Sequence, residues 1–104
     1  MTFFFSPDLS AEVEIPKDGI LSRTIHDDGV DKTVVFAFSA GQELSSHSAP
    51  VAADVFIARG RAILELGGER REAGTLAFAH MAPGLEHSVK AVEDLVMVLC
   101  MHRR

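Results

Sequence analysis

Turn-forming residues recur along this chain about every ten residues, and short apolar runs that suit β-strands lie between them. Glycines end several of these runs, and Pro50 stops another, because proline cannot join the middle of a hydrogen-bonded ladder. In residues 61–66, apolar Ala62, Leu64 and Leu66 alternate with other residues, which is the period of a strand with one buried face. Helical periodicity is nearly absent. The pattern predicts about eight to ten short strands in an all-β sandwich or barrel.

The length of 104 residues predicts one domain with a small core. We expect a barrel domain over residues 20–104 and an N-terminal extension over residues 1–19, which contains the one weak helix candidate, near residues 7–14. Phe3, Phe4 and Phe5 are too apolar for a free tail. The extension is therefore expected to pack on the barrel or on a partner subunit.

Charge and cysteine content exclude several classes of function. The net charge of −5 and the pI of about 5.4 argue against nucleic acid or an anionic membrane as a partner. Residues 1–12 lack the pattern of a signal peptide, and no apolar run approaches the roughly 20 residues of a membrane helix. The single cysteine, Cys100, permits no intramolecular disulfide, which predicts a cytoplasmic protein. Since Cys100 lies in an apolar run, we expect a buried, inert thiol.

Two blocks of the sequence resemble the two motifs of the cupin superfamily, of the small single-domain type with a conserved barrel. The first family motif is G-x5-H-x-H, three or four residues, then E-x6-G; Gly41, His47 and Gly60 stand at its spacing. The second is G-x5-P-x-G-x2-H; Gly74 opens it and His87 closes it two residues late. The likeness covers roughly residues 20 to 101. It implies a cupin-type jelly-roll β-barrel with a pocket in its mouth, and a homodimer.

The resemblance also implies a metal held by two histidines and a glutamate of the first motif and one histidine of the second. Here only His47 remains of the first three, because Ala49 and Ala53 occupy the other ligand positions. Asp54 is one residue off, and one step along a strand turns a side chain to the other face. We therefore expect Asp54 on the outer face.

His80 stands where the second motif has proline, and it offers a replacement ligand. If residues 75–80 and 87–91 form a hairpin, His80 faces His87 across two strands, with Cβ atoms about 5 Å apart. His47 would approach from the facing strand. Three neutral imidazoles and water suit a divalent transition metal, namely Zn, Fe, Ni or Mn. This hypothesis predicts a metal site made of His47, His80 and His87.

A metal-free pocket is the alternative, in which His47 and His87 are hydrogen-bond partners of a small molecule. The expected pocket wall is formed by Ala49, Val55, Ile57, Phe78, Val89 and Met97. Two functions stay open: a small-molecule binding protein, or a metal-dependent enzyme such as a dioxygenase, isomerase or decarboxylase. We find no carboxylate placed to orient a catalytic base, so a nucleophile triad is not expected. His26 is expected at the surface and His102 in a solvated tail.

Overall fold

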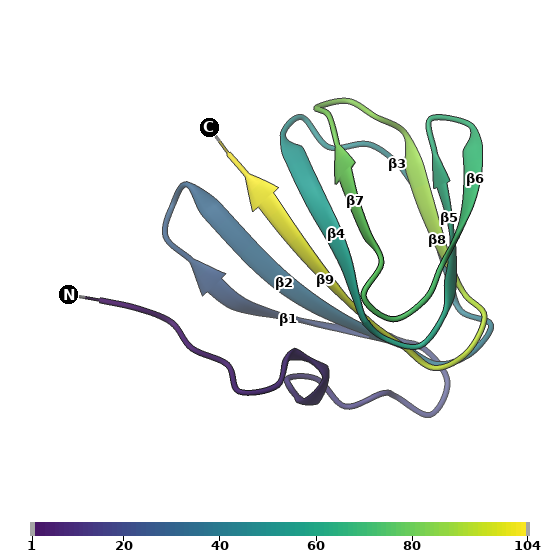
Figure 1. Ribbon diagram of the computed structural model, residues 1–104, viewed down its shortest axis with the longest axis horizontal. Coiled ribbons are helices and arrows are strands. Elements are labelled where there is room, and N and C mark those ends of the chain that lie inside the picture. Colours follow the sequence, from purple (N-terminus) through teal and green to yellow (C-terminus); the bar gives the residue numbers. More distant parts are fainter. Residues whose placement is uncertain (1, 104) are drawn as a thin grey trace.

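Nine antiparallel strands and one short helix form this protein, seen in a computed structural model that describes residues 2–103. Two sheets face each other (Figure 1). The five-stranded sheet has the order β1-β2-β9-β4-β7, and the four-stranded sheet has the order β3-β8-β5-β6. The all-β prediction is confirmed. The strands are β1 (Ile20–Asp27), β2 (Asp31–Phe38), β3 (Glu43–His47), β4 (Ala52–Arg59), β5 (Ala62–Leu66), β6 (Glu69–Ala73), β7 (Phe78–Met81), β8 (His87–Ala91) and β9 (Leu95–His102).

The main core lies between the two sheets. Its largest side chains include Phe38, Ile57, Leu95 and Met97, each with at most 2% of its surface exposed. Along β4 the apolar residues alternate with less buried ones, as the period of a strand requires when one face is inside. Alternation therefore decides which side chains of the five-stranded sheet face the interior.

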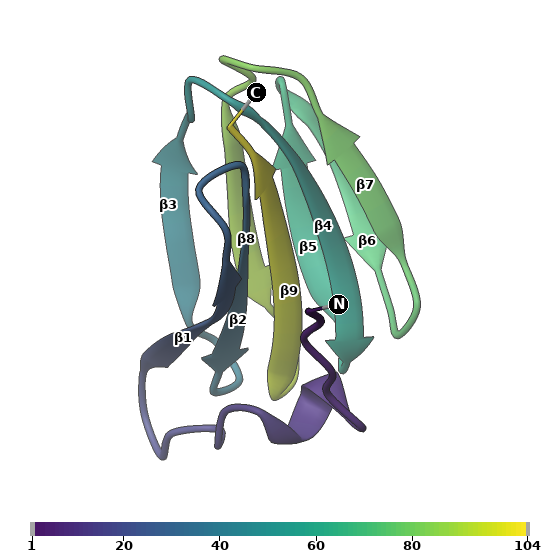
Figure 2. The ribbon, with the colours of Figure 1, turned by 90° about the vertical axis from the view of Figure 1, so that its left-hand side faces the viewer.

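A second apolar cluster covers part of the outer face of the five-stranded sheet. Val35, Val96 and Val98 are buried there, and the N-terminal segment packs over them through Leu9, Val13 and Ile15, among others. The short 3-10 helix η1 (Leu9–Ala11) crosses this face near β4 and β9, as Figure 2 shows. Strand β9 is thus covered on both faces, which explains why its sequence is apolar at successive positions.

The turn at Gly60 brings two backbones too close for any other residue. Its φ angle is 92°, and a Cβ atom there would lie 2.1 Å from the carbonyl oxygen of Asp94. Both facts require glycine. This glycine closes the first motif, so the motif spacing reflects a packing constraint between the end of β4 and the start of β9.

None of the helices described in residues 2–103 is long and apolar enough to cross a membrane.

Candidate functional site

Two histidines meet at one end of the four-stranded sheet. His47 is the last residue of β3 and His87 the first of β8, and the two are register partners. Leu44 pairs with Val89, so regular pairing would place Ser46 opposite His87. A bulge adds one residue to β3 and places His47 there instead. The two imidazole rings have centroids 4.3 Å apart, with an angle of 57° between their planes.

Hydrogen bonds to the backbone determine which nitrogen carries the proton in the neutral form of each of these two rings. Nδ1 of His47 lies 2.8 Å from the carbonyl oxygen of Ser45, and Nδ1 of His87 lies 2.9 Å from that of Leu85. A carbonyl oxygen only accepts, so each Nδ1 carries the proton and donates. In the neutral ring Nε2 then keeps its lone pair. His87 is buried whereas His47 is exposed, so the pair lies between the interior and the surface.

The predicted pocket wall is divided between the core and the surface. Val55, Ile57, Val89 and Met97 face the interior and belong to the main core, and Ala49 is half-buried. Phe78, however, is 64% exposed and pairs with Phe56 on the outer face of the five-stranded sheet. The expectation that Phe78 lines the pocket is wrong, because β7 turns its even-numbered residues outward.

The structure does not bring His80 to His87. Strand β7 pairs with β4 in one sheet, while β8 pairs with β3 and β5 in the other. The connection over residues 82–86 therefore crosses between sheets, and the predicted hairpin is wrong. His80 lies on the outer face, opposite Asp54 in the register. The expected outward position of Asp54 is confirmed.

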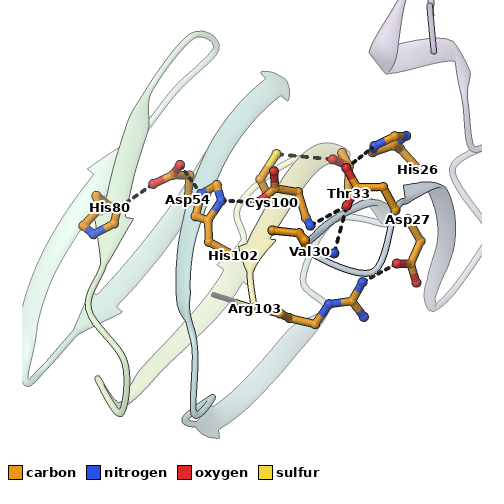
Figure 3. A network of polar contacts seen from close by, with 11 residues as sticks. His26, Asp27, Val30, Thr33, Asp54, His80, Cys100, His102 and Arg103 are labelled. Carbon is orange, nitrogen blue, oxygen red and sulfur yellow. Dashed lines mark hydrogen bonds and ion pairs between the residues drawn. The ribbon is translucent and has the colours of Figure 1, made fainter. Parts of the chain in front are cut away.

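A row of alternating carboxylates and imidazoles occupies that outer face (Figure 3). His80 Nδ1 lies 2.6 Å from Asp54 Oδ1, and His102 Nε2 lies 2.8 Å from Asp54 Oδ2. On its other side, His102 Nδ1 lies 3.0 Å from Asp31 Oδ1. The row crosses four adjacent strands, β7, β4, β9 and β2. His102 is thus part of β9, not of a tail, and His80 does have a carboxylate that orients it, contrary to the sequence-based expectation.

The charges of this row move two pKa values in opposite directions. Hydrogen bonds from His102 and His80 lower the pKa of Asp54 below its ordinary value. Hydrogen bonds to Asp31 and Asp54 raise the pKa of His102. Alternation along the sequence indicates the face of one member of this row. Asp54 lies between inward-facing Ala53 and Val55, which predicts that it faces out.

Of two other polar residues, His26 lies where the sequence predicts, whereas Cys100 does not. His26 is partly exposed and lies 3.5 Å from Asp28, as expected for a surface residue. Cys100 is only half-buried, and its Sγ lies 3.6 Å from the hydroxyl of Thr33 on the outer face. The thiol is thus less buried than its apolar sequence predicts.

Solved structures share this architecture closely. A conserved protein of unknown function from Streptococcus pyogenes is 30% identical, with a TM-score of 0.88, and the match covers 100% of this chain and 96% of that one. An RmlC-like cupin from Desulfovibrio desulfuricans is 23% identical, with a TM-score of 0.85 and coverages of 97% and 98%. A cupin superfamily protein from Desulfitobacterium hafniense is 13% identical, with a TM-score of 0.83 and coverages of 88% and 84%.

This chain has the cupin fold. No family model matches its sequence, and no curated protein matches it either. The fold is what carries the relationship.

The side chains of this protein do not fit the metal centre that the resemblance to cupins implies. His47 and His87 supply two imidazoles, but the glutamate position is Ala53, which is 3% exposed and lies between Met81 and Met101 in the register. Within residues 2–103, no group of three or more His, Cys, Asp or Glu side chains is placed to hold a metal ion. Apolar methionines thus flank the position from which a carboxylate would reach the ion.

Proposed function

We propose that this cupin binds a small molecule at the mouth of its barrel, with His47 and His87 as the polar anchors. The observation that carries the proposal is the pair of Nδ1 hydrogen bonds to backbone carbonyls. These bonds orient both rings and, in the neutral form, leave an acceptor Nε2 on each of two neighbouring rings. Ligand sites in proteins commonly combine an apolar wall with a few placed polar groups of this kind.

The surroundings of the pair favour one chemical class of ligand. Leu66 is the register partner of His87 and packs against the main core, so an apolar side chain adjoins the pair. The carboxylate of Glu86 lies nearby and accepts a hydrogen bond from the Ser46 hydroxyl. An anionic ligand would meet this carboxylate without a fixed cation. A molecule without negative charge, with an apolar body and two neighbouring hydroxyl or amine donors, matches the site better.

The test is a nitrogen-15 NMR titration that follows the imidazole Nε2 signals while small aliphatic and aromatic diols and amino alcohols are added. Binders should shift the Nε2 signals of His47 and His87, and His87→Ala should weaken binding by about tenfold, as expected for one well-placed hydrogen bond in a partly buried site. His26→Gln is the matched control, since His26 lies on β1. Binders that leave both Nε2 signals unmoved would exclude this role.

One observation keeps a metal-dependent enzyme as the second candidate. Histidines that bind metals usually donate their other ring N–H to a carbonyl or carboxylate, as both rings do here. Zn, Fe, Ni or Mn would then need further ligands from a substrate or water. Elemental analysis of protein purified without an affinity tag separates the candidates, because the enzyme requires a stoichiometric transition metal.

We also propose that the protein forms a homodimer. Phe3, Phe5 and Phe78 are exposed by 82%, 71% and 64%, and isolated small domains rarely expose so many large aromatic side chains. A second copy of this chain could cover these exposed side chains without any other protein.

The lack of any cysteine besides Cys100 supports a reducing compartment, and we propose the cytoplasm as the place of action.

A further inference from the structure

His102 lies between two carboxylates, and this geometry specifies its protonation state. Its Nε2 is 2.8 Å from Asp54 Oδ2 (Figure 3), and its Nδ1 is 3.0 Å from Asp31 Oδ1. An ionised carboxylate accepts hydrogen bonds and donates none, so both contacts require a proton on each ring nitrogen. Only the imidazolium form of His102 satisfies both partners. The neutral ring can donate to one of them, and its other lone pair then faces a negative charge.

The two carboxylates differ in how readily water can replace the hydrogen bond that His102 donates to each of them. The side chain of Asp31 is 51% exposed, whereas that of Asp54 is 26% exposed and also accepts a hydrogen bond from His80. A carboxylate that water can reach loses less when a hydrogen bond is broken. The single proton of neutral His102 therefore stays on Nε2, toward Asp54. The contact with Asp31 is the one that opens.

Asp31 is the first residue of β2 and ends the turn that joins β1 to β2. Asp28 organises that turn, because its Oδ1 accepts the backbone N–H groups of Val30 and Asp31. The same turn is attached to the end of β9, where the Arg103 N–H donates to the Val30 carbonyl at 2.7 Å. The Arg103 guanidinium also pairs with Asp27. The contact between His102 and Asp31 thus belongs to a clasp that fastens the β1–β2 turn to β9.

We propose that His102 is a pH-gated clasp: its imidazolium form ties the β1–β2 turn to β9 and β4, and its neutral form releases Asp31. The other charged groups around the clasp already have partners. Asp27 pairs with Arg103, Asp28 lies beside His26, and Asp54 keeps His80 in either state. The raised pKa of His102 agrees with this geometry. The proposal does not depend on the function proposed for the barrel mouth.

The clasp lies on the opposite face of the sheet from the main core. His102 follows Met101 in β9, and Asp54 follows Ala53 in β4, and both Met101 and Ala53 face that core. Release of Asp31 leaves the hydrogen bonds of Asp54 to His80 and His102 in place. Loosening is therefore confined to the β1–β2 turn.

Nitrogen-15 NMR of the intact chain tests the clasp directly. At pH 6 both ring nitrogens of His102 should carry protons, and on raising the pH Nδ1 should lose its proton while Nε2 keeps it. The same titration should lower the hydrogen-exchange protection of the Asp28 and Arg103 amides by up to about fivefold, the effect of one exposed ion pair. Protection is compared after correction for the intrinsic pH dependence of exchange.

Two variants and a control complete the test. Asp31→Asn removes the second charged acceptor, so the pH dependence of protection in the turn should disappear. His102→Gln should also abolish the pH dependence of protection in the turn. It provides the test if Asp31→Asn folds poorly. His47→Gln should retain the full pH dependence, because His47 ends β3 in the other sheet, whereas His26 would be unsuitable since it pairs with Asp28 in the turn itself. A neutral His102 at pH 6, or an unchanged pH dependence in both clasp variants, would overturn the proposal.

Discussion

Asp54 Oδ1 accepts a hydrogen bond from His80 Nδ1 at 2.6 Å, on the side of the five-stranded sheet that faces away from His87. This contact explains why the three histidines of the motif blocks do not form one site. Strand β7 pairs with β4, and the pairing turns His80 outward together with Asp54. The barrel mouth keeps the His47 and His87 pair, and His80 belongs to a separate row of charged groups.

The outer row should make stability depend on pH in a defined window. The pKa of Asp54 is lowered from 3.8, so its contribution is present above that pH and is lost as the pH falls through the folded pKa. The pKa of His102 is raised from 6.5, so its contribution is present below 6.5 and is lost as the pH rises through the folded pKa. The stabilisation from the row is greatest between these ordinary values. Urea unfolding of the wild type and of His102→Gln should differ most there, and an equal difference at pH 9 would contradict this.

Removing His80 should not affect any metal bound at the mouth. His80 lies on the outer face, so His80→Ala should leave the apparent affinity for Zn²⁺ or Ni²⁺ unchanged, whatever that affinity is. His87→Ala should lower it, because His87 and His47 are the imidazoles present at the mouth. Competition with a chromophoric chelator measures both variants. A loss with His80→Ala equal to that with His87→Ala would restore the three-histidine hypothesis.

Gly60 should tolerate substitution poorly. Gly60→Ala places a methyl group against the Asp94 carbonyl and strains a φ angle of 92°, so we expect a loss of about 3 kcal/mol or more in the free energy of unfolding. Gly84→Ala is the matched control, because Gly84 has a similar φ angle of 81° but open space around it. It should cost about 1 kcal/mol. Equal losses in urea unfolding would show that the contact with Asp94 is unimportant.

Substitution of two phenylalanines should affect the free energy of unfolding very differently, because one lies in the core and the other on the outer surface. Phe38 is fully buried, so Phe38→Ala should cost about 3–5 kcal/mol through lost contacts and an internal cavity. Phe78 is 64% exposed, so Phe78→Ala should change the free energy of unfolding of the monomer by no more than about 0.5 kcal/mol. Thermal and urea unfolding of both variants provide the comparison. A large loss with Phe78→Ala at high dilution would place this side chain in the folded core.

The proposed homodimer gives a mass prediction. Light scattering at micromolar concentrations should return twice the chain mass of 11.3 kDa. Replacing Phe3 and Phe5 by Ser should shift the mass toward the monomer if the N-terminal segment lies at the interface, and Phe78→Ser tests the outer face of β7. A mass near 11.3 kDa for the wild type across this range would contradict dimer formation.

Local patterns in the sequence were sufficient to predict the strands and the cupin-type fold. Alternation of apolar residues predicts which side of β4 is buried, and it predicts that Asp54 faces out. The motif glycine Gly60 reflects a close approach of two backbones, so its position was informative without a structure. These features depend on neighbouring residues or on one tight contact. They can therefore be predicted from the sequence.

The partners of the histidines were decided by the tertiary structure alone. Whether residues 82–86 close a hairpin or cross between sheets depends on which distant strands β7 and β8 pair with, and no local pattern contains that choice. The bulge that places His47 opposite His87 and the meeting of Asp31, Asp54 and His102 from three strands are likewise products of register. The sequence by itself determined the alternating strands and the turn chemistry of a cupin barrel. Only the pairing of strands far apart in the chain decided which charged groups meet, because side-chain contacts across a sheet depend on register between segments and not on spacing within one.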